Sequence, residues 1–181
     1  MKYIIASDIH GSAFWCEKLI QAFEREKADK MILLGDILYH GPRNDLPTEY
    51  APKKVIEMLN ALQGKVVSVR GNCDAEVETM VLNFPVSGDF AMMEVSGKTV
   101  FLTHGHIYNG EKRPPIAKGD ILVQGHTHVP VCEEREGYTL INPGSVSIPK
   151  ENSYNGYILL DGNEFIFKTL DGEIKKRYKI V

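Results

Sequence analysis

Five short clusters of metal-ligating side chains recur along this sequence, each after an apolar run and each next to a glycine. Carboxylates and neutral imidazoles are the ligands by which proteins hold zinc, manganese and iron. Five of the six histidines fall within these clusters, which is not the scatter expected of surface histidines. In chain order the clusters are Asp8-Ile9-His10-Gly11, Gly35-Asp36, Gly71-Asn72-Cys73-Asp74, His104-Gly105-His106 and Gly125-His126-Thr127-His128.

Taken one at a time, the clusters have ordinary explanations. Asp-x-His-Gly or Gly-Asp commonly opens a loop after a strand, Gly-Asn suits a simple turn, and His126 with His128 is compatible with structural histidines. The ordered recurrence of all five clusters is what favours a metal site. Two divalent ions about 3.5–4 Å apart need a shared anionic ligand besides their terminal ligands. Asp36 stands alone between the other sets and is the expected bridge.

The apolar runs that precede the first three clusters predict the elements that position them. Residues 2–7, 31–35 and 66–70 have the composition of short buried strands. Helical spacing of apolar residues separates them, beginning at the N-cap candidate Ser12 and again at Pro52. Strands that alternate with helices predict βαβ units and a parallel sheet. The carboxyl ends of such strands line the ligand crevice, so we expect the clusters to converge there.

The second half of the chain has strand signals without helices between them. A hairpin is predicted around Ser96-Gly97, apolar strands over 120–125 and 139–144, and antiparallel strands with Asp-Gly turns over 154–181. No repeat, low-complexity tract or linker interrupts the sequence. We therefore expect residues 1–181 to form one domain with a parallel front half and a strand-rich back half.

The composition excludes several classes of protein. The 181 residues are 43% apolar and 25% charged, with a net charge of −3, which is ordinary for a globular protein and predicts no stable nucleic-acid complex. The N-terminal apolar run is too short for a signal peptide, and no run reaches membrane-spanning length. Three cysteines without a paired pattern favour a reducing compartment. We expect a cytoplasmic protein with no membrane partner.

The ordered clusters resemble the motifs of the calcineurin-like metallophosphoesterases, which read D-x-H, G-D, G-N-H-[DE], a single H and G-H-x-H. The match runs from Asp8 to His128, and the segment NPGSVSIPK extends it to about residue 150. Within the family, the sequence is most similar to the small YfcE-like bacterial and archaeal phosphodiesterases, whose third motif reads G-N-C-D. The resemblance implies an α/β fold, a four-layer α/β/β/α sandwich of two mixed sheets flanked by helices.

The resemblance also implies a binuclear metal centre with a complete ligand set. Mn²⁺ is the expected metal, with Ni²⁺, Zn²⁺ or Fe as alternatives. The implied ligands are Asp8, His10, Asp36 and His128 for one ion, and Asp36, Asn72, His104 and His126 for the other.

The implied reaction is hydrolysis of a phosphodiester by in-line attack of a hydroxide that bridges the two ions. Asp36 and Asn72 would act in catalysis as ligands, and Asn72 would also contact the phosphoryl oxygens. In the wider family, the histidine of G-N-H-[DE], backed by the acidic residue, donates the proton to the leaving group. Cys73 and Asp74 stand at these two positions here, so the proton donor stays open, with His106 among the candidates.

Two residues of the loop after the second cluster are candidates for substrate binding, together with Asn72. His40 is also an alternative proton donor, and Arg43 is placed to meet a phosphate, although a solvated loop arginine is an equal explanation. For His106 the alternative to proton transfer is a role in orienting a metal ligand.

Two other functions are compatible with the sequence. A phosphomonoesterase acting on phosphoprotein or nucleotide would use the same metals. A non-catalytic scaffold of the same fold, as in the retromer trafficking subunit, would be expected to have lost ligands, and none is lost here. The expected partner is a small phosphodiester substrate. Exposed strand edges in the C-terminal half also predict a homo-oligomer, either a dimer or a tetramer.

Overall fold

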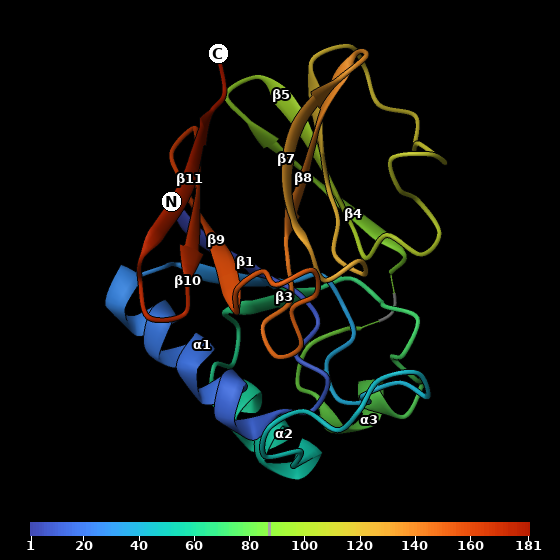
Figure 1. Ribbon diagram of the computed structural model, residues 1–181, viewed down its shortest axis with the longest axis vertical. Helices are drawn as coiled ribbons and strands as arrows, with labels where there is room; N and C mark the ends of the chain where they lie inside the picture. The colour runs from blue at the N-terminus through green and yellow to red at the C-terminus, as the bar shows by residue number, and fades with distance from the viewer. Residues whose placement is uncertain (87) are drawn as a thin grey trace.

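The computed structural model describes residues 1–86 and 88–181, which form two mixed β-sheets with helices beside one of them (Figure 1). Within these residues the elements are, in chain order, β1 (Lys2–Ala6), α1 (Ala13–Glu26), β2 (Lys30–Leu33), α2 (Pro52–Asn60), β3 (Val66–Ser68), α3 (Glu78–Val81), β4 (Phe90–Val95), β5 (Lys98–Thr103), β6 (Asp120–Val123), β7 (Pro130–Arg135), β8 (Tyr138–Pro143), β9 (Gly156–Asp161), β10 (Glu164–Thr169) and β11 (Ile174–Lys179).

The first sheet has the strand order β11-β10-β9-β1-β2-β3. Its strands β1, β2 and β3 are parallel, with Ile4 opposite Met31 and Met31 opposite Val66, as the βαβ pattern predicted. The C-terminal strands β9, β10 and β11 are antiparallel and add to the same sheet beside β1. The last 26 residues from Gly156 therefore complete the front half of the molecule instead of extending the back half.

The second sheet has the order β4-β5-β6-β8-β7. The predicted hairpin is confirmed: Val95 pairs with Lys98, and Ser96 and Gly97 both have positive φ, 52° and 75°, as a two-residue type I′ turn requires. Strands β5, β6 and β8 are parallel, so this sheet is mixed as well. The edge strand β7, which the sequence did not predict, pairs antiparallel with β8.

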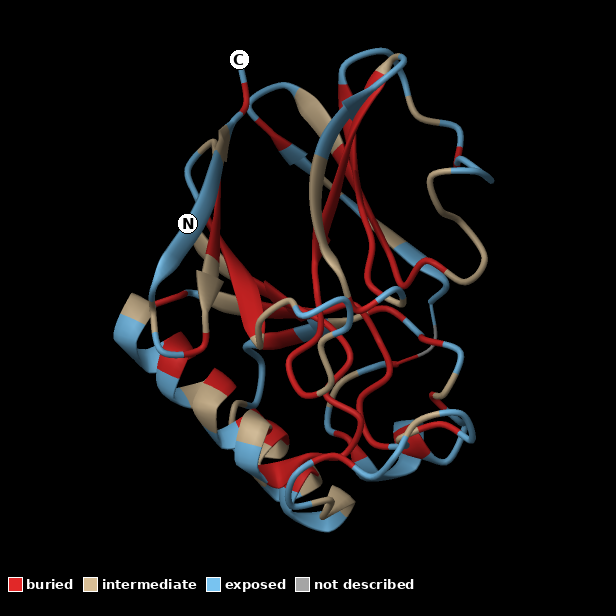
Figure 2. Cartoon of the chain, in the orientation of Figure 1, coloured by how far each residue is buried: buried red, intermediate tan, exposed pale blue. Residues whose placement is uncertain are grey.

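Apolar packing joins the layers (Figure 2). Helix α1 begins after Ser12, whose Oγ accepts a hydrogen bond from the amide of Trp15 at 3.3 Å, so the predicted N-cap is confirmed. One cluster of buried residues packs α1 and α2 on the first sheet, and another fills the space between the two sheets. The second cluster includes Ile5, Ile32, Leu34, Val69, Val100, Leu102, Ile121, Val123, Ile141, Ile158, Leu160, Phe165 and Phe167.

The outer face of the second sheet is covered by irregular chain. Tyr108 and Ile116, from the segment between β5 and β6, pack on buried side chains that include Phe101 and Leu140. The predicted α/β class with two mixed sheets is confirmed, but residues 88–181 contain no helix, so the fourth layer is a loop. Consecutive prolines in this segment, Pro114-Pro115, oppose a helix because proline lacks the amide hydrogen.

None of the helices in the described part of the chain is both long enough and apolar enough to cross a membrane.

Candidate metal centre

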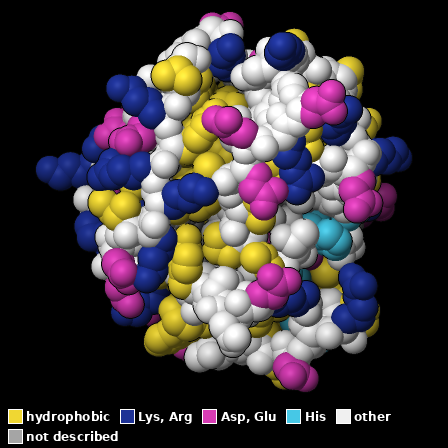
Figure 3. Space-filling view, turned by 45° about the horizontal axis from the view of Figure 1, so that its top comes forward, with side chains coloured by type: hydrophobic (Ala, Val, Ile, Leu, Met, Phe, Trp, Pro, Cys, Tyr) yellow, Lys and Arg dark blue, Asp and Glu magenta, His cyan; other side chains and the backbone are white. Residues whose placement is uncertain are grey.

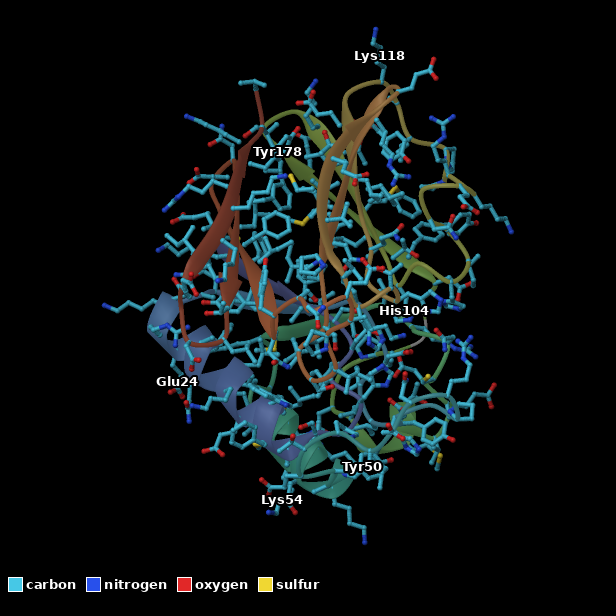
Figure 4. All side chains as sticks on the ribbon, in the orientation of Figure 1. Glu24, Tyr50, Lys54, His104, Lys118 and Tyr178 are labelled. Carbon is cyan, nitrogen blue, oxygen red and sulfur yellow. The ribbon has the colours of Figure 1, made fainter. Side chains whose placement is uncertain are left out.

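The loops that follow five strands meet at one place. Three of these strands, β1, β2 and β3, belong to the first sheet, and two, β5 and β6, belong to the second. Figure 4 places His104, which directly follows β5, between the strands and the loops that lead to the helices. All seven predicted ligands come from these loops. Asp8, His10, Asp36, His104 and His128 are buried, His126 is half-buried and Asn72 is exposed.

The first predicted set of ligands is gathered around Asp8. Its Oδ1 lies 3.5 Å from His10 Nε2 and 3.2 Å from His128 Nε2. The two imidazole Nε2 atoms are 3.3 Å apart. These three side chains, from the loops after β1 and β6, therefore converge on one point between the two sheets.

The second set is gathered around His104. Its Nε2 lies 3.0 Å from Asn72 Oδ1 and 3.3 Å from His126 Nδ1. Asp36 lies between the two sets, because its Oδ2 is 3.4 Å from His104 Nε2 and 3.7 Å from His10 Nε2. A single carboxylate thus contacts both groups of ligands.

Backbone carbonyls fix the orientation of three imidazoles. The Nδ1 atoms of His10, His104 and His128 lie 2.7–2.8 Å from the carbonyl oxygens of Tyr39, Leu34 and Ile148. A carbonyl only accepts, so each Nδ1 carries a proton, and in the neutral form of each ring the lone pair of Nε2 points into the cluster. This is the arrangement in which histidines bind metal ions.

The cluster has more acceptors than its own hydrogens satisfy. His104 Nε2 faces the side-chain oxygen of Asn72, and His10 Nε2 faces His128 Nε2, so both pairs juxtapose lone pairs unless a cation or a proton lies between them. Asp8 Oδ1 is buried and makes no hydrogen bond of ordinary geometry with the described residues. Buried acceptors without donors are costly, and the residues present fit divalent cations with nitrogen and oxygen ligands.

The electrostatics of the cluster agree with this geometry. Burial acts to raise the pKa of Asp8, but contacts with the imidazoles of His10 and His128 outweigh it and hold that pKa well below its usual range. Burial acts to lower the pKa of His104, yet its contact with Asp36, the nearby Asp8 carboxylate and the Leu34 carbonyl raise that pKa to about 9. The anionic cluster therefore attracts positive charge, which a bound metal ion or protons supply.

Five of the predicted ligands have left-handed backbone conformations. Their φ angles are 59° at Asp8, 50° at His10, 54° at Asp36, 67° at His126 and 63° at His128. Residues with a Cβ adopt this region infrequently, and such strain gathers at functional sites. The turns after β1, β2 and β6 are held in this form by the surrounding structure, which aims the side chains inward.

Two glycines allow the loops to approach so closely. A Cβ on Gly71 would collide with the Asp36 carboxylate and backbone amide, and a Cβ on Gly125 would collide with the side chain of Ser7 and contact Asp8 Oδ2. The glycines next to the ligands in the sequence are therefore required by space, not only by turn geometry.

Asp74 supports the loops from below and does not face the cluster. Its carboxylate accepts backbone N–H groups of Asp36 and Ile37, both at 2.8 Å, and of Gly71 at 2.7 Å. Cys73 lies beside the cluster: its amide donates to Asp36 Oδ1 at 2.8 Å, and its Sγ accepts from Asn72 Nδ2 at 3.2 Å. Burial and the nearby carboxylates raise the pKa of the Cys73 thiol, so it stays protonated.

Three further candidates have different positions. The His40 ring lies between those of Tyr39 and Tyr50, and it is absent from the residues that line the cleft above the cluster. His106 packs its ring near those of His104 and His126, with centroids 5.4 and 6.3 Å apart. Arg43 lines the cleft.

The cleft has a volume of about 380 Å³ and includes residues that sequence reasoning missed. Thr127 and Lys150 line it together with Asp36, Asn72 and Cys73. Thr127 lies between two predicted ligands in the sequence, and Lys150 ends the segment NPGSVSIPK, so both positions carried an available signal. On the face drawn in Figure 3, histidine side chains reach the surface at one place, with basic side chains nearby.

Glu78 is a further residue that the sequence did not reveal. It lies in the first turn of α3, is only 3% exposed, and its Oε2 has no hydrogen-bond partner among the described residues. Burial and the charge of Asp74 raise the pKa of Glu78 to about 8. A neutral carboxylic acid therefore lies beneath the carboxylate that holds the metal-site loops.

The Glu78 carboxyl predicts a specific pH dependence of stability. Its folded-state pKa lies above the ordinary value of 4.5, so between these values the native state binds more protons, and stability falls as pH rises. We expect Glu78→Gln to unfold at the same temperature as the native sequence near pH 5 and at a temperature several degrees higher at pH 8. Thermal unfolding at both pH values measures this, with the exposed Glu76→Gln as the matched control. A difference that is the same at both pH values would contradict it.

Two facing mixed sheets, with carboxylates, imidazoles and one amide from five strand ends gathered around one shared carboxylate, define the class of metallophosphoesterases. The chain belongs to the calcineurin-like phosphoesterase superfamily, whose domain model matches residues 1–164. This membership confirms the predicted family and the predicted class of enzyme, a metal-dependent phosphoric ester hydrolase.

Individual relatives agree with the family. The chain is 47% identical over 163 residues to phosphodiesterase YfcE of Escherichia coli strain K12, which spans 90% of this chain and 89% of that protein. The solved structure of YfcE, a phosphoesterase from E. coli, superposes with a TM-score of 0.96 at 44% identity over all of both chains. Vps29 of Entamoeba histolytica, complexed with Zn²⁺, superposes with a TM-score of 0.66 at 20% identity over all of both chains, which shows a shared fold alone.

Proposed function

We propose that this protein hydrolyses phosphodiesters with a pair of divalent metal ions. The observation that carries the proposal is the position of the Asp36 carboxylate, whose Oδ2 contacts imidazoles of both ligand sets. The proposal is supported by the 47% identity to a protein named a phosphodiesterase. The proposed ligands are Asp8, His10, Asp36 and His128 for one ion and Asp36, Asn72, His104 and His126 for the other, with Mn²⁺ as the working metal.

The protein's own groups prepare the site for this reaction. When bound, the two ions neutralise phosphate charge and lower the pKa of a water molecule so that it attacks phosphorus near neutral pH. Asn72 is the exposed member of the ligand set, so its side-chain amide is placed to donate to a phosphoryl oxygen. Asp74 holds the backbone of Asp36 and of Gly71, and thereby the positions of both loops. No covalent intermediate on the protein is needed.

The leaving group receives little help from general acids in this site. Cys73 lines the cleft, and a thiol is a weaker acid than an imidazolium near neutral pH. Burial and the charge of His104 lower the pKa of His106, so this imidazole is mostly neutral at pH 7 and packs against ligand rings. We assign His106 the orienting role and expect esters with good leaving groups, such as aryl esters, to react fastest.

The direct test compares two chromogenic esters. Protein freed of metal and reloaded with Mn²⁺ is expected to bind two ions per chain and to hydrolyse bis-p-nitrophenyl phosphate faster than p-nitrophenyl phosphate. Elemental analysis and p-nitrophenol release measure these. Turnover of the monoester alone would favour the phosphomonoesterase alternative. Fewer than one bound ion and no turnover of either ester would favour the scaffold, although all seven ligand positions are retained.

Replacing the cysteine at the mouth tests the missing proton donor. We expect Cys73→His to keep two bound ions and to increase kcat for alkyl diesters about tenfold or more, because an imidazole donates a proton near neutral pH. The kcat for aryl diesters should change little, since the leaving group departs as the p-nitrophenolate anion and needs no proton. Steady-state rates on the two ester types measure this. Cys73→Ser is the control, and loss of an ion in that variant would identify Cys73 as a ligand.

The broader expectations follow from the same comparisons. We propose that residues 1–181 form one domain of the family, which is supported by the match of the YfcE structure over the whole chain. A small phosphodiester as the substrate is supported by the modest volume of the cleft. A cytoplasmic location is supported by three free cysteines, Cys16, Cys73 and Cys132. The homo-oligomer stays a prediction, which light scattering of the purified protein tests.

A further inference from the structure

The cleft above the candidate metal centre has two cationic side chains at its rim. Arg43 and Lys150 both line it, and both are exposed, whereas the ligands beneath them are mostly buried. They come from separate loops, one after β2 and the other between β8 and β9. Both cations therefore border the space that a ligand beside Asp36 and Asn72 would occupy.

Each of the two loops contacts a residue of the ligand loops through its backbone or by close packing. The amide of Lys150 donates to the carbonyl of His128 at 3.1 Å, and the Lys150 carbonyl accepts from Ser153 Oγ at 2.6 Å. On the other side, a Cβ placed on Gly41 would lie 3.0 Å from Cys73 Sγ, so the loop that carries Arg43 packs against the cysteine at the mouth. These contacts hold the backbone of both loops in place, whereas the long side chains of the two cations are free to rotate.

The charges of both residues are available to a ligand. Neither Arg43 nor Lys150 forms an ion pair or side-chain hydrogen bond with the residues that the structure describes, whereas seven other basic side chains are paired with carboxylates. Asp36 is the only acidic residue that lines the cleft, and it is a proposed metal ligand. A cationic rim on a chain of net charge −3 favours an anionic ligand at this place.

The scissile phosphate does not need these cations. Two divalent ions carry four positive charges, and the proposed ligand set supplies two negative ones, from Asp8 and Asp36, because its other members are neutral imidazoles and an amide. The remaining two positive charges are balanced by the attacking hydroxide and by the single negative charge of a phosphodiester. The two rim cations are therefore available to a further anionic group on the same substrate.

We propose that Arg43 and Lys150 form a second anion subsite, so that the preferred substrates are phosphodiesters that carry an additional phosphate group. This inference rests on the proposed function for the placement of the scissile phosphate. A phosphate monoester carries nearly two charges at neutral pH and three acceptor oxygens, which suit a guanidinium and an ammonium group together.

The test compares ligands that differ by one phosphate. Isothermal titration of the Mn²⁺-loaded protein with adenosine 3′,5′-bisphosphate and with adenosine 5′-monophosphate gives two affinities, and inhibition of bis-p-nitrophenyl phosphate hydrolysis gives the same pair independently. We expect the bisphosphate to bind about tenfold tighter or more. The ratio should fall below about threefold in the double variant Arg43→Gln/Lys150→Gln, with each single variant intermediate.

Lys118→Gln is the matched control, because Lys118 lies at the top of the molecule in Figure 4, well away from His104 near the middle. It should keep the ratio of the native sequence. Equal affinities in the native protein, or a ratio unchanged in the double variant, would overturn the subsite. Failure of the proposed function is a different result, namely no Mn²⁺-dependent turnover of bis-p-nitrophenyl phosphate, and the titration still decides the subsite in that case.

Discussion

Asp36→Asn is expected to lower kcat/KM for bis-p-nitrophenyl phosphate by about a thousandfold or more, which corresponds to about 4 kcal/mol of transition-state stabilisation. The Oδ2 atom of Asp36 contacts His10 in one ligand set and His104 in the other. Removing its charge therefore weakens both proposed ion sites at once. Elemental analysis should give fewer than two ions per chain, and steady-state kinetics measure the loss of turnover.

Asp36→Asn is expected to preserve the fold. Asparagine tolerates the left-handed conformation that Asp36 adopts, with φ of 54°, and it is nearly isosteric with aspartate. The negative charge of the nearby Asp8 also ceases to repel a second carboxylate. Asp45→Asn, at an exposed position of the same loop, is the control and should keep full activity. Near-normal activity of Asp36→Asn with two bound ions would refute the bridging role.

Asp74→Asn is expected to destabilise the protein by about 2–4 kcal/mol and to abolish metal binding. The carboxylate accepts three backbone N–H groups, from Asp36, Ile37 and Gly71, and hydrogen bonds to charged acceptors are worth about 1.5–3 kcal/mol each. The side-chain amide of asparagine has only one acceptor oxygen, and its NH₂ group would face a backbone N–H that the carboxylate accepts. Relief of repulsion with Asp36 acts in the opposite direction, which keeps the net loss below the sum. Denaturant unfolding and metal titration measure the two effects.

Asp120→Asn separates a general loss of stability from a loss at the site. Asp120 is also buried and also accepts two backbone N–H groups, from Thr99 at 2.9 Å and Ala117 at 2.8 Å, but it lies in the second sheet away from the ligand loops. We expect this variant to lose stability and to retain metal content and kcat. If Asp74→Asn retained both as well, Asp74 would support the fold alone and not the positions of the ligands.

The sequence predicted the candidate ligands because each of them is encoded locally. A short apolar run ends in a glycine and a polar group, and parallel strands bring such ends together, so Asp8, Asp36 and Asn72 were placed near one another without knowledge of any long-range contact. Local turn chemistry likewise predicted the Ser96-Gly97 hairpin. The pairing of β9 with β1 joins residues more than 150 positions apart, and no local pattern specifies that contact.

Local sequence patterns did not reveal which polar side chains are buried or which residues they contact. Glu78 lies in a segment with the polarity of a solvent-exposed helix, yet the fold places it beneath Asp74. His40 follows Asp36 by four residues, and the sequence did not reveal that the aromatic rings of Tyr39 and Tyr50 pack against it. Lys150 reaches the cleft only because its amide is bonded to the carbonyl of His128.

The left-handed turns of the ligand loops set function against stability. The conformation costs each of the three histidines about 1–2 kcal/mol, so together they cost about 3–6 kcal/mol, which is a large part of the unfolding free energy of an ordinary domain. Selection for catalysis maintains these unfavourable backbone conformations. A descendant released from catalysis would gain stability from glycine or asparagine at His10, His126 or His128. Loss of activity in this fold is therefore thermodynamically downhill, and binding proteins that keep the sheets without the ligands are its expected evolutionary products.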